Sequence, residues 1–192
     1  MKLNKKGFML AEVVVSASVI AVILVTLYIG LNRMTSAYET RNRYYDIDAQ
    51  QVAMEVNDAL KRNGNSIFAI LGDDYIRLPE LEGNEEFKSD APALCKLYTE
   101  KLDITEKLDI TADNVYIVKG IDYILNGIGV LEKLNSGKSN LGILKDEITN
   151  ESFKDYLDYI INKIDFEEEY SYFIVVELQK NNDYYYYTLK VK

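Results

Sequence analysis

The amino-acid sequence predicts an α+β fold, in which a long N-terminal helix packs its outer half on a C-terminal antiparallel sheet. Three observations predict it. Residues 8–31 are apolar apart from one charge, residues 35–62 keep a helical spacing of apolar side chains without a proline, and residues 170–191 alternate like a β-hairpin. We therefore divide the chain into a basic leader (1–7), a transmembrane helix (8–34), its amphipathic continuation (35–62) and a head domain (63–192).

Composition narrows the classes of function. The chain has 192 residues with 22 basic and 31 acidic side chains, and its net charge of −9 argues against broad binding to nucleic acid or anionic lipid. It has no histidine, which rules out Ser-His-Asp and Cys-His catalysis and removes the usual imidazole ligands of zinc. The single Cys95 forms no internal disulfide and fits no metal-ligand spacing. We expect no catalytic residue, no cofactor and no metal.

The apolar stretch 8–31 can cross a membrane. As a helix rising about 1.5 Å per residue it spans roughly 36 Å, more than the hydrocarbon core of about 30 Å. The stretch is longer than the apolar region of a cleavable secretory signal, and Thr35-Ser36-Ala37 is a poor cleavage site at its far end. Basic residues flank both ends, so charge sets the orientation only weakly, and the short leader favours a cytoplasmic N-terminus.

Glu12 is the one charge inside this stretch. A carboxylate at the bilayer centre costs about 2.5 to 3.5 kcal/mol, and less near the start of the helix, where Glu12 lies. One interpretation is a carboxylate that extends to the lipid headgroups one turn into the helix. The other depends on its neighbours, because Lys5 and Lys6 precede Gly7 and Phe8, and Glu12 lies five places beyond the glycine.

This constellation resembles the class III signal of type IV prepilins and pseudopilins, over roughly residues 5–34. The resemblance implies that a membrane-bound prepilin peptidase cleaves after Gly7 and methylates the new amino group of Phe8. A residue without a side chain lets a peptidase approach the backbone closely. In the family, the glutamate at the place of Glu12 is thought to meet the N-terminal amine of a neighbouring subunit, and in an apolar bundle such a pairing selects the axial register.

The resemblance implies a minor pilin or pseudopilin. Ile29 stands where major pilins often carry a kinking proline, and one cysteine forbids their C-terminal disulfide loop. It also implies a single-pass cytoplasmic-membrane protein with an external C-terminal domain, which enters an extracellular fibre of a pilus, competence or secretion system. The implied partners are other pilin subunits, the prepilin peptidase and the assembly platform, with nucleic acid reached only indirectly through a competence fibre. The alternative is a bitopic protein with an uncleaved signal anchor and an external binding or enzymatic domain.

The helix is expected to continue through Arg62 and to end at Asn63-Gly64-Asn65. Its outer half carries an apolar stripe made of Tyr45, Val52, Val56, Ala59 and Leu60. Packing of this stripe on a sheet gives the shape expected of pilins. Residues 66–114 are expected to form a variable connection with short elements. They contain the tandem KLDITE and KLDITA at 101–112, but two copies of six residues do not make a solenoid.

The sequence of the rest of the head predicts one more strand, two helices with apolar stripes and the C-terminal hairpin. Residues 115–118 read as a strand, and the apolar residues from Ile121 to Leu134 have helical spacing, weakened by Gly127 and Gly129. A stronger helical stripe is formed by Phe153, Leu157, Ile160, Ile161 and Ile164, with Asn150 or Ser152 as its cap. The C-terminal hairpin turns at Asn181-Asn182.

Four weaker signals have ordinary explanations. Residues 135–139 resemble the end of a phosphate-binding loop, but Glu132 replaces its first glycine, which favours a turn. Asp46-Ile47-Asp48 begins like a calcium loop and lacks the rest of it, which favours ordinary helix surface. Residues 184–187 offer tyrosine rings for stacking, although alternation puts half of them in the core. Paired carboxylates leave acid–base catalysis formally open, but 31 acidic residues place such pairs on any solvated surface.

Overall fold

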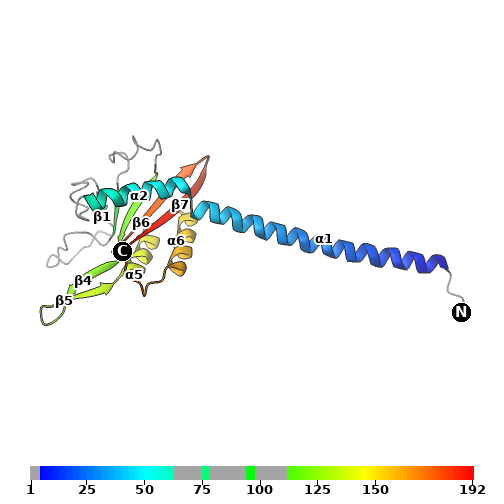
Figure 1. Cartoon of the computed structure of the whole chain (residues 1–192), viewed down its shortest axis with the longest axis horizontal. Coiled ribbons are helices and arrows are strands. Elements are labelled where there is room, and N and C mark those ends of the chain that lie inside the picture. The colour runs from blue at the N-terminus through cyan, green and yellow to red at the C-terminus, as the bar shows by residue number, and fades with distance from the viewer. Residues whose placement is uncertain (1–4, 63–74, 78–93, 98–111) are drawn as a thin grey trace. The chain divides into compact units, whose positions relative to one another are not determined.

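The computed structural model describes residues 5–62, 75–77, 94–97 and 112–192. They belong to two compact units, Met1–Asn42 and Arg43–Lys192. The first unit is helical throughout its described part, and the second combines helices with an antiparallel sheet (Figure 1). The fold is therefore α+β, as the sequence predicts.

Two consecutive helices occupy the N-terminal third of the chain, α1 (Lys5–Tyr44) and α2 (Ile47–Arg62). The expectation of one unbroken helix to Arg62 is wrong, because the helix is interrupted at Tyr45 and Asp46. Asp46 explains the break: its Oδ1 accepts hydrogen bonds from the amides of Asp48 and Ala49, both at 3.0 Å. A side chain that binds the first free amides of a helix stabilises a new start at that point.

The apolar stripe of α2 differs in part from the predicted one. Val52, Val56 and Leu60 are buried as expected, and two alanines complete the stripe, Ala49 and Ala53. Tyr45 is not part of it, since its side chain is 47% exposed. Tyr45 lies in the break before α2, so it does not follow the helical spacing that an unbroken helix would give it. The expected helix stop at 63–65 and the tandem repeat up to residue 111 lie outside the described residues.

Five antiparallel strands form the main sheet of the second unit, in the order β1-β2-β3-β6-β7. They are β1 (Tyr75–Arg77), β2 (Leu94–Leu97), β3 (Asn114–Lys119), β6 (Tyr172–Lys180) and β7 (Asp183–Val191). The C-terminal hairpin is confirmed, and its turn residues Asn181 and Asn182 have φ values of 52° and 69°. Two successive residues in the left-handed region are typical of the type I′ turn that favours tight hairpins.

Helices cover both faces of this sheet (Figure 1). On one face α2 contacts β6 and β7, and on the other lie α5 (Gly137–Glu147) and α6 (Glu151–Lys163). Alternate residues of β6 enter the two cores: Ile174 packs in the cluster with α2, and Val175 in the cluster with α6. The sequence predicted the helical stripe of α6 but not the second layer that it forms.

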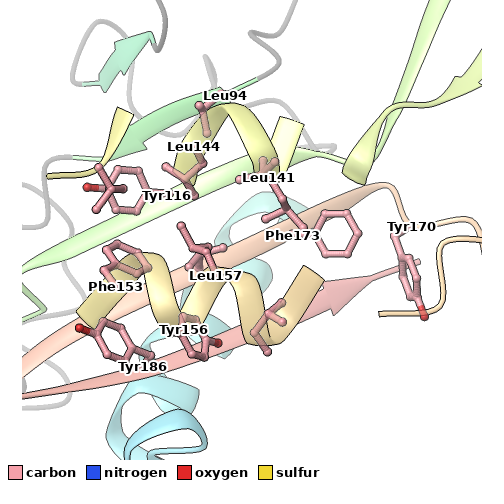
Figure 2. Packing of buried hydrophobic residues seen from close by; sticks show 14 residues of the cluster. Leu94, Tyr116, Leu141, Leu144, Phe153, Tyr156, Leu157, Tyr170, Phe173 and Tyr186 are labelled. Atoms are coloured by element: carbon pink, nitrogen blue, oxygen red, sulfur yellow. The ribbon is translucent and has the colours of Figure 1, made fainter. Parts of the chain in front are cut away.

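Aromatic rings dominate the core beneath α6 (Figure 2). The rings of Tyr156 and Tyr186 stack with centroids 4.8 Å apart, and Phe153 stacks on Tyr186 at 5.1 Å. The hydroxyl of Tyr156 lies 2.6 Å from that of Thr188 and so finds a polar partner inside the core. Tyr186 is fully buried, which confirms that the tyrosine run 184–187 contributes to the core.

A second, two-stranded sheet replaces the helix expected between Ile121 and Leu134. It consists of β4 (Ile121–Leu125) and β5 (Leu131–Asn135) in antiparallel register. Gly129, with φ +77°, adopts a left-handed conformation in the connection, which favours a turn over a helix. The expectation of a helix here is wrong because the chain turns at Gly129 and the segments on either side pair as strands.

The starts of α5 and α6 differ in how well the sequence predicts them. The turn expected at 135–139 is instead the start of α5, with Ser136 just before Gly137. The cap of α6 is as predicted, since Asn150 Oδ1 accepts a hydrogen bond from the amide of Ser152 at 3.0 Å. A carboxamide acceptor at this position stabilises a helix by about 1 kcal/mol.

Candidate assembly segment and head surface

The apolar side chains of α1 are exposed within its own unit. From Met9 to Leu31 every described side chain is exposed, for example Leu10 at 71% and Leu31 at 63%. Soluble proteins rarely expose apolar patches of this size, so another apolar phase must cover them. By length and composition the helix can cross a membrane, which makes α1 a candidate membrane span.

Four hydroxyl side chains of this helix, Ser18, Thr26, Thr35 and Thr40, bond to its own backbone. Ser18 Oγ donates to the carbonyl of Val14 at 2.7 Å, and Thr26 Oγ1 donates to that of Ile23 at 2.8 Å. Such bonds satisfy a hydroxyl where no water is present. Glu12 therefore differs from them, as the only charged side chain between Phe8 and Leu31.

The predicted processing residues lie at the very start of α1. Lys5, Lys6, Gly7 and Phe8 have helical backbone, and Glu12 follows Phe8 by about one turn. The Glu12 side chain is exposed, and no other charged side chain lies within a turn of it on the helix. The pairing of Glu12 with a neighbouring subunit and the cleavage after Gly7 both stay predictions.

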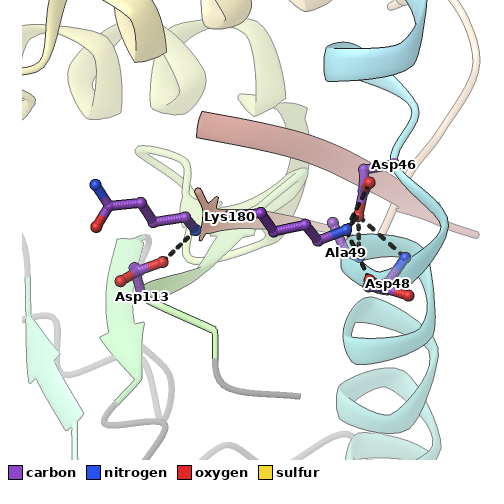
Figure 3. Close-up of polar contacts among 6 residues, drawn as sticks. Asp46, Asp48, Ala49, Asp113 and Lys180 are labelled. Carbon is purple, nitrogen blue, oxygen red and sulfur yellow. Dashed lines mark hydrogen bonds and ion pairs between the residues drawn. The ribbon is translucent and has the colours of Figure 1, made fainter. Parts of the chain in front are cut away.

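A cluster of charges lies where α2 begins (Figure 3). Lys180 Nζ lies 2.7 Å from both carboxylate oxygens of Asp46 and 2.7 Å from Oδ2 of Asp48. It also lies 5.1 Å from the ring centroid of Tyr185, a cation–π contact. Burial opposes ionisation of Lys180, but its bonds to Asp46 and Asp48 outweigh burial and raise its pKa. The two carboxylates therefore hold a lysine of β6, and Asp46 is more than ordinary helix surface because it also caps α2.

Two further contacts tie the ends of the sheet strands to their neighbours. Arg43 Nη2 lies 3.0 Å from Asp183 Oδ1, next to the turn of the C-terminal hairpin. At the opposite end of that turn the amide of Gln179 donates to the carboxylate of Asp113 (Figure 3). These contacts attach the hairpin β6–β7 both to the start of the second unit and to β3.

Glu177 is a buried carboxylate that sequence reasoning missed. It is 3% exposed on β6 and accepts hydrogen bonds from Asn114 Nδ2 at 2.5 Å and Asn150 Nδ2 at 3.0 Å. Burial raises its pKa, and the two amides partly oppose that rise. The three side chains join β3, β6 and the cap of α6. The signal in the sequence was a single glutamate inside the apolar run of 173–178.

The connection between β4 and β5 presents apolar side chains on a rigid turn. Ile128 is 88% exposed, Leu131 64% and Val130 58%. Asn126 organises the turn, since its Oδ1 accepts from the amides of Ile128 at 3.1 Å and Val130 at 3.0 Å. At the base, Asn135 Nδ2 donates to the carbonyl of Phe166 at 2.5 Å and holds the strand pair to the head.

Within the described ranges, no group of three or more acidic or cysteine side chains is placed to hold a metal ion. Comparison of the chain with protein-family models, with curated proteins and with solved structures found no match.

Proposed function

We propose that the chain is the precursor of a minor pilin or pseudopilin, a non-catalytic subunit that assembles through its N-terminal helix into a type IV pilus-like fibre. The exposed apolar surface of α1 between Met9 and Leu31, in which Glu12 is the only charge, is the observation that supports this function most. A helix of this kind first needs lipid around it, and copies of the same helix offer a second apolar environment. With α1 in the cytoplasmic membrane, the head lies outside the cell membrane and α1 anchors it there.

In this proposal, the position of the Glu12 carboxylate on α1 directs how the copies assemble. Cleavage after Gly7 creates an amine at Phe8, about one helical turn from Glu12. A carboxylate without a partner in an apolar bundle costs several kcal/mol, and a neighbouring subunit's amine removes that cost when the two helices are shifted to the right height. Glu12 then selects the axial register of the copies, while the apolar side chains supply the contact area.

The head supplies interaction surfaces in this proposal. Within the second unit, Lys180 binds Asp46 and Arg43 binds Asp183, which fastens the start of this unit to its sheet. Other pilin subunits, the prepilin peptidase and the assembly platform are the proposed partners.

The test is the mass of the mature chain. In a host that supplies a prepilin peptidase, wild-type protein from membrane fractions should begin at Phe8. Gly7→Val should keep Met1, because a β-branched side chain obstructs the backbone at the scissile bond. Gly30→Val is the matched control on the same helix, since nothing lies within 4 Å of a Cβ at Gly30, and it should mature normally. Equal maturation of all three would remove the pilin proposal, and an intact Met1 in the wild type would favour the bitopic alternative.

A further inference from the structure

The interruption between α1 and α2 does not come from a proline or a glycine. Sharp breaks in long helices occur mostly at such residues, and residues 33–62 contain neither. Asp46 supplies the local part of the break, because its side chain caps the amides of Asp48 and Ala49. Further contacts join the four residues 43–46 to the sheet and to α6.

Polar contacts fix the two ends of the segment 43–46. At one end, Arg43 Nη2 lies 3.0 Å from Asp183 Oδ1. At the other end, Lys180 Nζ holds the carboxylate of Asp46 at 2.7 Å (Figure 3). The amide of Asp46 donates to the carbonyl of Tyr186 on the edge strand β7 at 3.4 Å. In a continuous helix that amide would bond to the carbonyl four residues earlier, so β7 takes the place of a helical partner.

Tyrosine side chains hold the middle of the same segment. The ring centroid of Tyr44 lies 5.1 Å from that of Tyr156 and 5.0 Å from that of Tyr159. The hydroxyl of Tyr45 lies 3.3 Å from that of Tyr159, although these two residues are 114 positions apart. Aromatic pairs in edge and tilted arrangements contribute beyond the area that they bury. The segment is therefore held by residues that lie far along the chain.

We propose that the break at residues 45–46 is one of two states of this segment, and that the contacts of residues 43–46 with the head act as a latch that selects it. When the latch opens, residues 45–46 become helical, and α1 and α2 join into one helix that ends at Arg62. Joining gives the amides of residues 46–49 carbonyl partners within the helix. The latch lies within the second compact unit, so it acts whether or not the chain enters a fibre.

The two states exclude each other. α2 stays in place in both, because its apolar stripe is buried against the sheet. The amide of Asp46 donates either to Tyr186 or to the carbonyl of residue 42, but not to both. The Asp46 side chain caps α2 only when that helix begins at Ile47. No intermediate arrangement keeps both sets of hydrogen bonds.

NMR spectroscopy of the full chain in detergent micelles tests the latch, because the Cα chemical shift of a residue reports whether its backbone is helical. In the wild type, Tyr45 and Asp46 should have non-helical shifts. Lys180→Met combined with Tyr159→Ala removes two partners in the head and leaves residues 33–62 unchanged. This double variant should move both shifts to helical values, since the local cap alone no longer holds the break.

The matched control is Lys145→Met combined with Ile161→Ala, which removes another ion-paired lysine and another half-buried side chain of α6. Its shifts at residues 45–46 should stay non-helical. Asp46→Ala removes the cap and the anchor of Lys180 without altering the sheet, and Tyr45 should become helical in this variant too.

Ile47→Pro gives the reverse test. Proline fits the first position of a helix but not its interior, and it keeps the preceding residue extended. Added to the Lys180→Met and Tyr159→Ala chain, it should restore the non-helical shifts. Non-helical shifts in the double variant without this proline would overturn the proposal, as would helical shifts in the wild type or in the matched control.

Discussion

Lys180, the last residue of β6, binds both carboxylate oxygens of Asp46 at 2.7 Å, although the two residues are 134 positions apart. Asp46 caps α2 with the same side chain. One carboxylate therefore starts a helix and fastens that helix to β6, a strand inside the sheet.

Loss of this lysine should loosen the junction. Lys180→Met keeps the apolar stem, which is partly buried, and leaves Asp46 without its cation. We expect a loss of about 1 to 2 kcal/mol in the free energy of unfolding of the head, a value reduced for the partial exposure of the pair. Lys145→Met is the matched control, since Lys145 forms an exposed pair with Asp158 at 2.7 Å, and it should have a smaller effect. Urea unfolding of the two variants measures the difference, and equal losses would contradict the role of Asp46.

The outer helix should be essential to the head. A fragment that begins at Arg43 keeps the second compact unit, so it should be soluble and should unfold cooperatively. A fragment that begins at Asn63 lacks α2 and uncovers Ile174 and Val176 of β6, where each buried side chain contributes roughly 1.5 to 3 kcal/mol. We expect the shorter fragment to aggregate or to melt far earlier.

Calorimetry of both fragments, with and without a reducing agent, checks this. The reducing agent should change neither transition, since Cys95 is the only cysteine. Equal stability of the two fragments would mean that α2 only tethers the head.

Two glycines should respond in opposite ways to the same substitution. A Cβ at Gly120 would lie 2.0 Å from the carbonyl oxygen of Tyr170, so Gly120→Ala forces the backbone apart and should cost about 1 to 3 kcal/mol. Nothing lies within 4 Å of a Cβ at Gly142 in α5, where alanine should stabilise the helix by about 0.5 to 1 kcal/mol. Thermal unfolding of both variants checks these expectations. An unchanged stability of Gly120→Ala would contradict the close approach of the end of β3 to the start of β6.

Glu177 should make the stability of the head depend on pH. Because burial raises the pKa of Glu177 in the folded head above its ordinary value of 4.5, the folded state favours the protonated form. Its contribution is fully present below pH 4.5 and is lost as the pH rises through the raised pKa. Glu177→Gln carries no titrating group, so the melting temperature of wild type minus that of the variant should be larger at acid pH than at neutral pH. A difference that stays constant across this range would show that Glu177 has an ordinary pKa.

Glu12 should matter for assembly and not for insertion. In Glu12→Ala the apolar stretch 8–31 loses its only charge, so cleavage and membrane insertion should remain normal. Recovery in sheared fibres should fall at least about tenfold, because a lost pairing of 1.4 kcal/mol or more has that effect. Glu39→Ala, on the same helix beyond the apolar run, should leave recovery unchanged. Undiminished recovery of Glu12→Ala would mean that this carboxylate only reaches the lipid headgroups.

An element can be predicted from the sequence where its apolar pattern fits only one kind of secondary structure. The C-terminal hairpin and α6 are of this kind, since Asn181-Asn182 turns between alternating runs and Asn150 caps a regular stripe. In residues 121–134 the apolar spacing predicts a helix, and the structure has a hairpin that turns at Gly129 instead. The break at Asp46 comes from a local cap on the amides of Asp48 and Ala49, which the spacing of apolar residues does not reveal, and its ion pair with Lys180 lies beyond any local window. The roles of Gly7, Phe8 and Glu12 remain predictions from the resemblance.

The position of β6 in the chain affects how the protein can be made. This strand lies between β3 and β7 and is covered on both sides, yet it begins only at Tyr172. While the chain is being synthesised, α2 appears early and has no sheet to cover its stripe until nearly all residues have emerged. Pairing of distant segments is slow, and apolar surface that waits for it promotes aggregation. The nascent chain should therefore need a holding factor until its last residues are released, and one truncated before Tyr172 should be degraded.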